Sequence, residues 1–113
     1  MIEEYQFGSM KIAGKRYRND LKIVGERVIA GWWRREGHSV EEADVDDILA
    51  AKPGILVVGM GNPGRMQVTD PLRSALAGAG IRLIEEPTAA ALQTFNRLSA
   101  EGKDVAGAFH LTC

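Results

Sequence analysis

The feature that most constrains the fold is the apolar run at residues 55–58, Ile-Leu-Val-Val, which contains no polar side chain. A strand with one face in water alternates apolar and polar residues, whereas a strand covered on both faces is apolar throughout. Extended and helical patterns alternate after this run, as in sheets whose parallel strands are joined by helices. The sequence therefore predicts a three-layer α/β fold with a central mixed, partly parallel sheet.

The two parts of the chain differ in their patterns. The first third is rich in β-branched and aromatic residues and is broken by turns, which predicts a small antiparallel β region, whereas the helices come from the later two-thirds. A helix that starts at Ser39 or Asp44 should end at Pro53, and Thr69 should cap the next one. The predicted strands are 5–8, 10–12, 16–17, 21–24, 27–34, 55–59, 81–85 and 105–112, and the later helices are 71–77 and 88–101.

Size and charge narrow the function classes. With 113 residues the chain has room for one core, so residues 1–113 are expected to form a single domain. Fourteen basic and fifteen acidic residues give a net charge of -1, which argues against a nucleic acid or a membrane surface as partner. No apolar run approaches the roughly 20 residues that cross a bilayer, and the acidic start MIEEYQ is unlike a targeting peptide. We expect a cytoplasmic protein.

Residues 59–64, Gly-Met-Gly-Asn-Pro-Gly, match the pattern G-x-G-x-x-G directly after the apolar run. A dinucleotide site needs the last glycine in the first turn of a helix, whose free N–H groups bind the pyrophosphate. Here the helix is expected to start at Thr69, after a loop of about ten residues, and the chain has room for little more than one nucleotide-binding half. We therefore favour close loop packing and positive φ as the role of these glycines, and we predict no cofactor.

A weaker ligand-binding hypothesis applies to the same loop. Free N–H groups between Gly61 and Gly64, with Asn62 and Arg65 beside them, could hold a small anion or a partner's carboxylate. Thr88 should lie at the carboxyl end of a neighbouring strand, where open α/β sheets place ligands. This loop is the alternative site, for a small anion or a small metabolite.

Residues 32–38 read Trp-Trp-Arg-Arg-Glu-Gly-His. Adjacent tryptophans in a strand face opposite ways, so if one lies in the core the other needs a second layer, a partner or water. An exposed tryptophan beside arginines has the composition of a protein–protein hot spot. The competing interpretation is that helices and the β region cover both indoles. Trp32, Trp33, Arg34 and His38 are thus the candidate partner-binding residues.

The sequence predicts neither a catalytic residue nor a metal site. Cys113 is the only cysteine, and His110 should face the opposite side of an extended strand, so the pair lacks the geometry of a thiol and its base. The histidines and carboxylates show no metal-ligand spacing. The acidic residues between 41 and 47 are interpreted as a solvated helix start. An enzymatic activity is left open but not favoured.

Motifs spread along the chain include Gly14-Lys15-x-Tyr17, Trp33-Arg34-x-Glu36-Gly37-His38, Lys52-Pro53-x-Ile55-Leu56, Pro87-Thr88-x-x-Ala91 and His110-Leu111-Thr112-Cys113. Taken together, these motifs resemble a small α/β domain of unknown function. That family includes archaeal and bacterial single-domain proteins, the human adipogenesis-associated protein and the mitochondrial assembly factor for respiratory complex I. The resemblance implies a three-layer fold with a central mixed sheet, and no established catalytic residues.

The residues and the resemblance together predict a non-enzymatic domain that binds another protein, as an assembly or accessory factor. The alternative is binding of a small anion or metabolite at the loop from Gly61 to Arg65. Whether the chain forms a homo-oligomer is left open.

Overall fold

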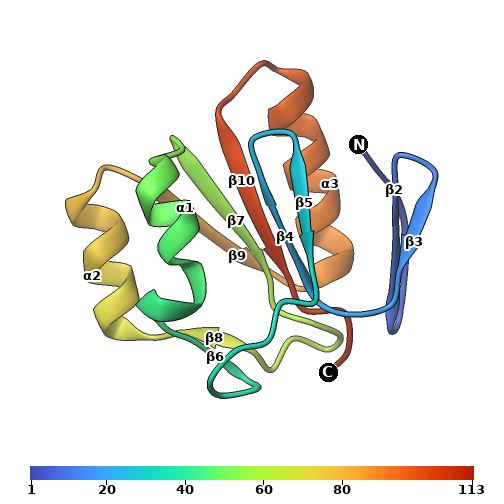
Figure 1. The fold of residues 1–113 in the computed structure, drawn as a ribbon, viewed down its shortest axis with the longest axis horizontal. Coiled ribbons are helices and arrows are strands. Elements are labelled where there is room, and N and C mark those ends of the chain that lie inside the picture. Colours follow the sequence, from blue (N-terminus) through green and yellow to red (C-terminus); the bar gives the residue numbers. More distant parts are fainter.

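The computed structural model describes residues 1–113 and has three layers (Figure 1). The central layer is a five-stranded sheet made, in spatial order, of β5 (Arg27–Ala30), β4 (Leu21–Val24), β10 (Val105–Phe109), β7 (Ile55–Gly59) and β9 (Arg82–Glu86). β10, β7 and β9 run parallel, whereas β4 is antiparallel to both β10 and β5. The sheet is therefore mixed and partly parallel, as predicted.

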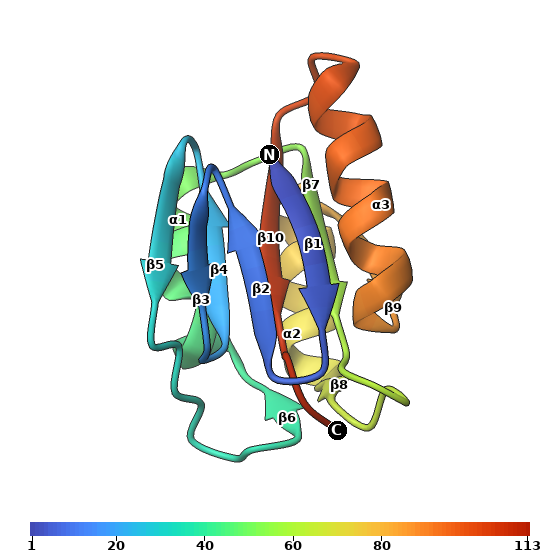
Figure 2. The same ribbon diagram turned by 90° about the vertical axis from the view of Figure 1, so that its right-hand side faces the viewer.

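Helices cover both faces of this sheet. α1 (Asp46–Ala51) and α2 (Asp70–Gly78) lie on one face, and α3 (Thr88–Ala100) lies on the other (Figure 1). An antiparallel sheet of β1 (Ile2–Gln6), β2 (Ser9–Ile12) and β3 (Lys15–Tyr17) stands beside α3 (Figure 2). The short strands β6 (Ser39–Val40) and β8 (Gln67–Val68) form a parallel pair. None of the helices is long and apolar enough to span a bilayer.

The alternation of side chains along β7 supplies two separate cores. Leu56 and Val58 belong to the cluster under α1 and α2, whereas Val57 belongs to the cluster under α3. All three are fully buried, which confirms that the apolar run is covered on both faces. On β10, a Cβ at Gly107 would lie 3.1 Å from the ring of Phe95, which shows how closely α3 packs on the sheet.

Two predicted strands are too long at their carboxyl ends. The strand predicted over residues 27–34 ends at Ala30, because Gly31 adopts a left-handed φ of +68° and turns the chain out of the sheet. The N–H of Trp32 then donates to the carbonyl of Asp20 at 2.8 Å rather than to a strand partner. The last strand ends at Phe109 instead of residue 112, so both tryptophans and His110 lie in loops.

The start of the chain and the first helix also differ from the prediction. β1 begins at Ile2, and Phe7 lies in the turn that follows it. Ser39 is in β6 and caps no helix. Asp44 lies in a 3₁₀ turn (Glu42–Val45), where its buried carboxylate accepts the N–H of Glu41 at 2.8 Å. Asp44 is thus a buried cap rather than part of a solvated helix face.

Candidate functional site

The glycine-rich loop is separated from the helix that follows it. Thr69 caps α2 and its hydroxyl accepts the N–H of Leu72, so α2 begins after the loop, as predicted. Gly61 has a φ of +103°, and a Cβ there would overlap the carbonyl oxygen of Thr112 and lie 2.7 Å from Cδ2 of His110. The glycines let this loop pack directly against the C-terminal segment, which confirms their structural role.

Most N–H groups of the loop from Gly61 to Arg65 are engaged within the chain. Three of them donate to protein oxygens: that of Gly61 to Oγ1 of Thr88 (2.8 Å), that of Asn62 to the carbonyl of Thr112 (2.8 Å), and that of Arg65 to the carbonyl of Cys113 (3.2 Å). The expectation that these three groups are free is therefore wrong. Gly64, at a φ of +121°, packs against Pro87, and none of the three surface hollows includes Arg65.

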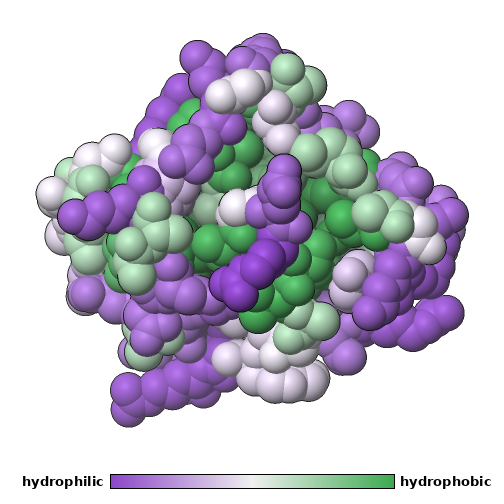
Figure 3. All heavy atoms as spheres, turned by 45° about the horizontal axis from the view of Figure 1, so that its top comes forward, coloured by the Kyte–Doolittle hydropathy of each residue, from purple (hydrophilic) through white to green (hydrophobic).

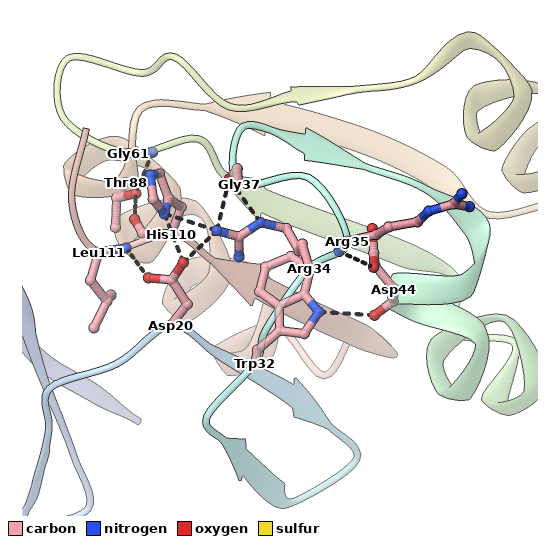
Figure 4. Close-up of polar contacts among 10 residues, drawn as sticks. All are labelled: Asp20, Trp32, Arg34, Arg35, Gly37, Asp44, Gly61, Thr88, His110 and Leu111. Atoms are coloured by element: carbon pink, nitrogen blue, oxygen red, sulfur yellow. Dashed lines mark hydrogen bonds and ion pairs between the residues drawn. The ribbon is translucent and has the colours of Figure 1, made fainter.

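A buried ionic cluster lies next to this loop, at the carboxyl end of β10 (Figure 4). Because β4 is antiparallel to β10, the residue before β4, Asp20, lies beside His110, which follows β10. One carboxylate oxygen of Asp20 accepts the N–H of Leu111 at 2.8 Å. The other lies 2.7 Å from both Nδ1 of His110 and Nη2 of Arg34. Since a carboxylate only accepts, Nδ1 of His110 carries the proton in this contact.

Two of the three nitrogens of the Arg34 guanidinium are held by hydrogen bonds. The side chain of Arg34 is only 5% exposed, and its Nε and Nη2 donate to the carbonyl of Gly37 (Figure 4). Its guanidinium lies 4.6 Å from the ring of Trp32, whose own Nε1 donates to the carbonyl of Asp44 at 2.9 Å. The loop that carries Arg34 is thus tied to both the core and the end of β10.

The two adjacent tryptophans have opposite environments. Trp32 is 4% exposed and belongs to the core under α1 and α2, whereas Trp33 is 78% exposed. The interpretation that both indoles are covered is therefore wrong. Neither lies in a strand, yet the two neighbouring side chains have opposite environments, as adjacent side chains of a strand do. The fold thus presents the indole of Trp33 at the surface, next to the buried indole of Trp32.

A concave surface of about 340 Å³ lies beside Trp33. We call it the Arg34 hollow, and the side chains that define it are Arg18, Asp20, Trp33, Arg34, His38 and His110. The ring of His38 packs edge-on against that of His110 at a centroid distance of 5.6 Å. Nη1 of Arg34 and Nε2 of His110 are buried and have no hydrogen-bond partner in the chain. Most residues that line the hollow are polar or charged, and Asp20 is the only acid among them.

A larger hollow, of about 460 Å³, opens between the N-terminal sheet, the β4–β5 turn and the end of α3. Figure 3 brings this end of the molecule forward and shows hydrophobic surface between hydrophilic side chains. The walls of this larger hollow include core residues such as Ile23, Phe95 and Val105. It contains no predicted site residue and lies outside the ionic cluster.

The pKa of Asp20 reflects two opposing effects. Burial raises the pKa of Asp20, but the hydrogen bonds from His110, Leu111 and Arg34 lower it by more, so the pKa lies below the usual range of an aspartate. Burial, reinforced by the charge of Asp20, raises the pKa of Tyr5, whose hydroxyl donates to the carbonyl of Leu111 at 2.9 Å. The N-terminal sheet is thereby linked to the cluster.

We expect the fold to lose stability in acid through Asp20. Because its pKa is lower in the folded chain than in the unfolded one, the ionised carboxylate stabilises the fold above the unfolded pKa of about 4. This contribution is lost as the pH falls through the folded pKa. Urea unfolding between pH 7 and pH 3 should show a steeper loss for the wild type than for Asp20→Asn. Equal slopes for the two proteins would contradict this assignment.

The structure brings together only some of the predicted site residues. Trp33, Arg34 and His38 meet at the hollow, whereas Asn62 and Arg65 lie on the neighbouring glycine loop with exposed side chains. Sequence reasoning missed Asp20 and considered His110 only as a partner of Cys113. Asp20 lies between β3 and β4, where an acidic residue in a turn carries no signal of burial.

Comparison with known proteins gives the family. A family model described as "Protein of unknown function (DUF498/DUF598)" matches residues 2–110. The chain belongs to this family. It is similar to the crystal structure of a conserved hypothetical protein from Pyrococcus horikoshii OT3, at 26% identity and a TM-score of 0.84, over 100% of this chain and 99% of the other.

Two further solved structures share the fold. One is described as an outer membrane protein from Bartonella henselae (21% identity, TM-score 0.82, covering 99% of this chain and 94% of that one). The other is a Mth938-like domain from Bordetella pertussis (20% identity, TM-score 0.71, covering 97% and 84%). The family resemblance inferred from the sequence motifs is confirmed.

Proposed function

We propose that this domain binds another protein through the surface around Trp33, as a non-enzymatic accessory or assembly factor. The observation that carries the proposal is the exposure of Trp33, 78%, directly beside two fixed residues, Trp32 and Arg34. Tryptophan is the residue most typical of binding hot spots. An indole presented by an already ordered loop loses little further conformational freedom on binding.

A second exposed aromatic side chain supports the same surface. Phe7 is 60% exposed and lies in the turn between β1 and β2. The N–H of Gly8 in this turn donates to the carbonyl of Leu111 at 2.8 Å, and Leu111 also lines the Arg34 hollow. The turn that carries Phe7 is thus hydrogen-bonded to a residue that lines the hollow beside Trp33. The exposed side chains of His38, Asn62 and Arg65 complete the proposed surface, and a cytoplasmic location belongs to the same proposal.

Replacing Trp33 by alanine tests this function. We expect Trp33→Ala to weaken binding of the partner by roughly 30-fold or more, because truncating a hot-spot tryptophan costs about 2 kcal/mol or more. The free energy of unfolding should change by less than about 0.5 kcal/mol, since the indole packs on little of the chain. The partner is isolated from the native host with tagged protein, and its affinity for each purified variant is measured by calorimetry.

Arg97→Ala serves as the control, because Arg97 is exposed on α3 and pairs only with Glu101 on the same helix. It should bind the partner like the wild type. If Trp33→Ala retains the wild-type affinity, or if no stoichiometric partner is recovered with the wild type, the proposed function is wrong.

A further inference from the structure

The charges that line the Arg34 hollow do not balance. Arg18 and Arg34 contribute two cations, and His38 and His110 add two imidazoles. Asp20 is the only acid in the hollow, and it is already paired with Arg34 at 2.7 Å. Arg18 takes part in none of the ion pairs of the chain. The hollow therefore has an excess of positive charge although the chain as a whole has a net charge of -1.

The buried side chains of the hollow also have unused hydrogen-bonding capacity. Nη1 of Arg34 and Nε2 of His110 have no partner, and their side chains are 5% and 7% exposed. A buried polar nitrogen without a partner costs free energy, and a buried guanidinium attracts negative charge more strongly than an exposed one does. Arg34 lines the hollow, so a negatively charged acceptor that enters it is drawn towards this guanidinium. Nε2 of His110 is itself an acceptor while Nδ1 carries the proton, so it adds no attraction for an anion.

We propose that the Arg34 hollow binds a carboxylate of the partner protein, either an acidic side chain or the chain terminus. This inference rests on the proposed function. Nη1 of Arg34 and the unpaired guanidinium of Arg18 can each donate to a carboxylate, and Trp33, which also lines the hollow, provides an apolar surface for the rest of the same residue. The volume of about 340 Å³ is near the lower limit of small-molecule sites, which suits one side chain better than a nucleotide.

Benzoate and benzamide are matched probes, because they share size and shape but only benzoate is charged. In a titration of the full chain followed by ¹H–¹⁵N spectra, we expect saturable benzoate shifts at the Trp33 indole and at the amides of His38 and Leu111. Benzamide should bind at least about tenfold more weakly. Equal affinities, or no saturation by benzoate, would overturn the inference.

Arg18→Gln separates charge recognition from folding. Because Arg18 is exposed, we expect the variant to keep its fold while benzoate binds several-fold more weakly. Arg97→Gln removes the same charge from the distant face of α3 and should bind benzoate like the wild type. If both variants weaken benzoate binding equally, the effect comes from the net charge of the protein, and a specific site is contradicted.

Competition with the isolated partner distinguishes this inference from the proposed function. If the partner's carboxylate occupies the hollow, excess benzoate displaces the partner and excess benzamide does not. Benzoate that binds without displacing the partner assigns the hollow to a free small acid and overturns the inference, but leaves protein binding intact. Conversely, unchanged partner binding by Trp33→Ala contradicts the proposed function, whatever the result of the benzoate titration.

Discussion

Gly61→Ala is expected to destabilise the domain by roughly 3 to 5 kcal/mol, because two unfavourable effects coincide at this residue. The first is backbone strain, since a φ of +103° is rarely accessible to residues with a side chain. The second is steric overlap of the new methyl group with the carbonyl oxygen of Thr112 and with the ring of His110. Relief of the overlap requires a shift of the C-terminal backbone, which cannot rotate away as a flexible side chain can.

The expected loss corresponds to a drop in Tm of more than about 10 °C for a domain of this size. Thermal and urea unfolding measure it directly. Gly78→Ala is the matched control, because Gly78 is the last residue of α2, has no heavy atom within 4 Å of an added Cβ and shows no positive φ. That variant should be neutral or slightly more stable than the wild type. Similar losses for both variants would refute the packing role of Gly61.

Asp20→Asn is expected to reduce the free energy of unfolding by about 3 to 5 kcal/mol. The substitution keeps the shape of the side chain but leaves the guanidinium of Arg34, 5% exposed, without a counter-charge. It also places an amide where His110 and Arg34 both need an acceptor. The cost arises from an uncompensated buried charge, which is larger than the net contribution of the ion pair itself.

Two further variants of this chain test this explanation of the Asp20→Asn effect. Glu101→Gln breaks the exposed pair with Arg97, whose atoms are 3.6 Å apart, and should change stability by less than about 0.5 kcal/mol. The double variant Asp20→Leu with Arg34→Met removes both charges and should be more stable than Asp20→Asn alone. A loss below about 1 kcal/mol for Asp20→Asn would show that the cluster is not buried as described.

Local patterns were enough to predict the layers of the fold. The apolar run in β7 indicated a strand covered on both faces, and the sequence Thr69-Asp70-Pro71 located the start of α2. These predictions succeed because side-chain periodicity and helix capping depend on residues close together in the chain. The end of β5 was missed because a strand can stop at any glycine that adopts a positive φ, and Gly31 was not distinguished from other glycines.

The candidate site could be predicted only in part. The tryptophan pair and Arg34 attracted attention by their composition, but the sequence left open which indole is exposed. The alternative hypothesis, a ligand site at the loop from Gly61 to Arg65, depended on free N–H groups. Three of these groups donate to oxygens of Thr88, Thr112 and Cys113. No local pattern reveals such pairings, because the acceptors lie far away along the chain.

By itself, the sequence determined a three-layer α/β fold and placed the start of the next helix after the glycine loop. Only the tertiary structure decided that Asp20 pairs with His110, 90 residues away, and that Trp33 faces the surface while Trp32 lies in the core. The reason is physical. Periodicity and capping are local properties, whereas the environment of a charge or an indole depends on which distant strands the sheet brings together.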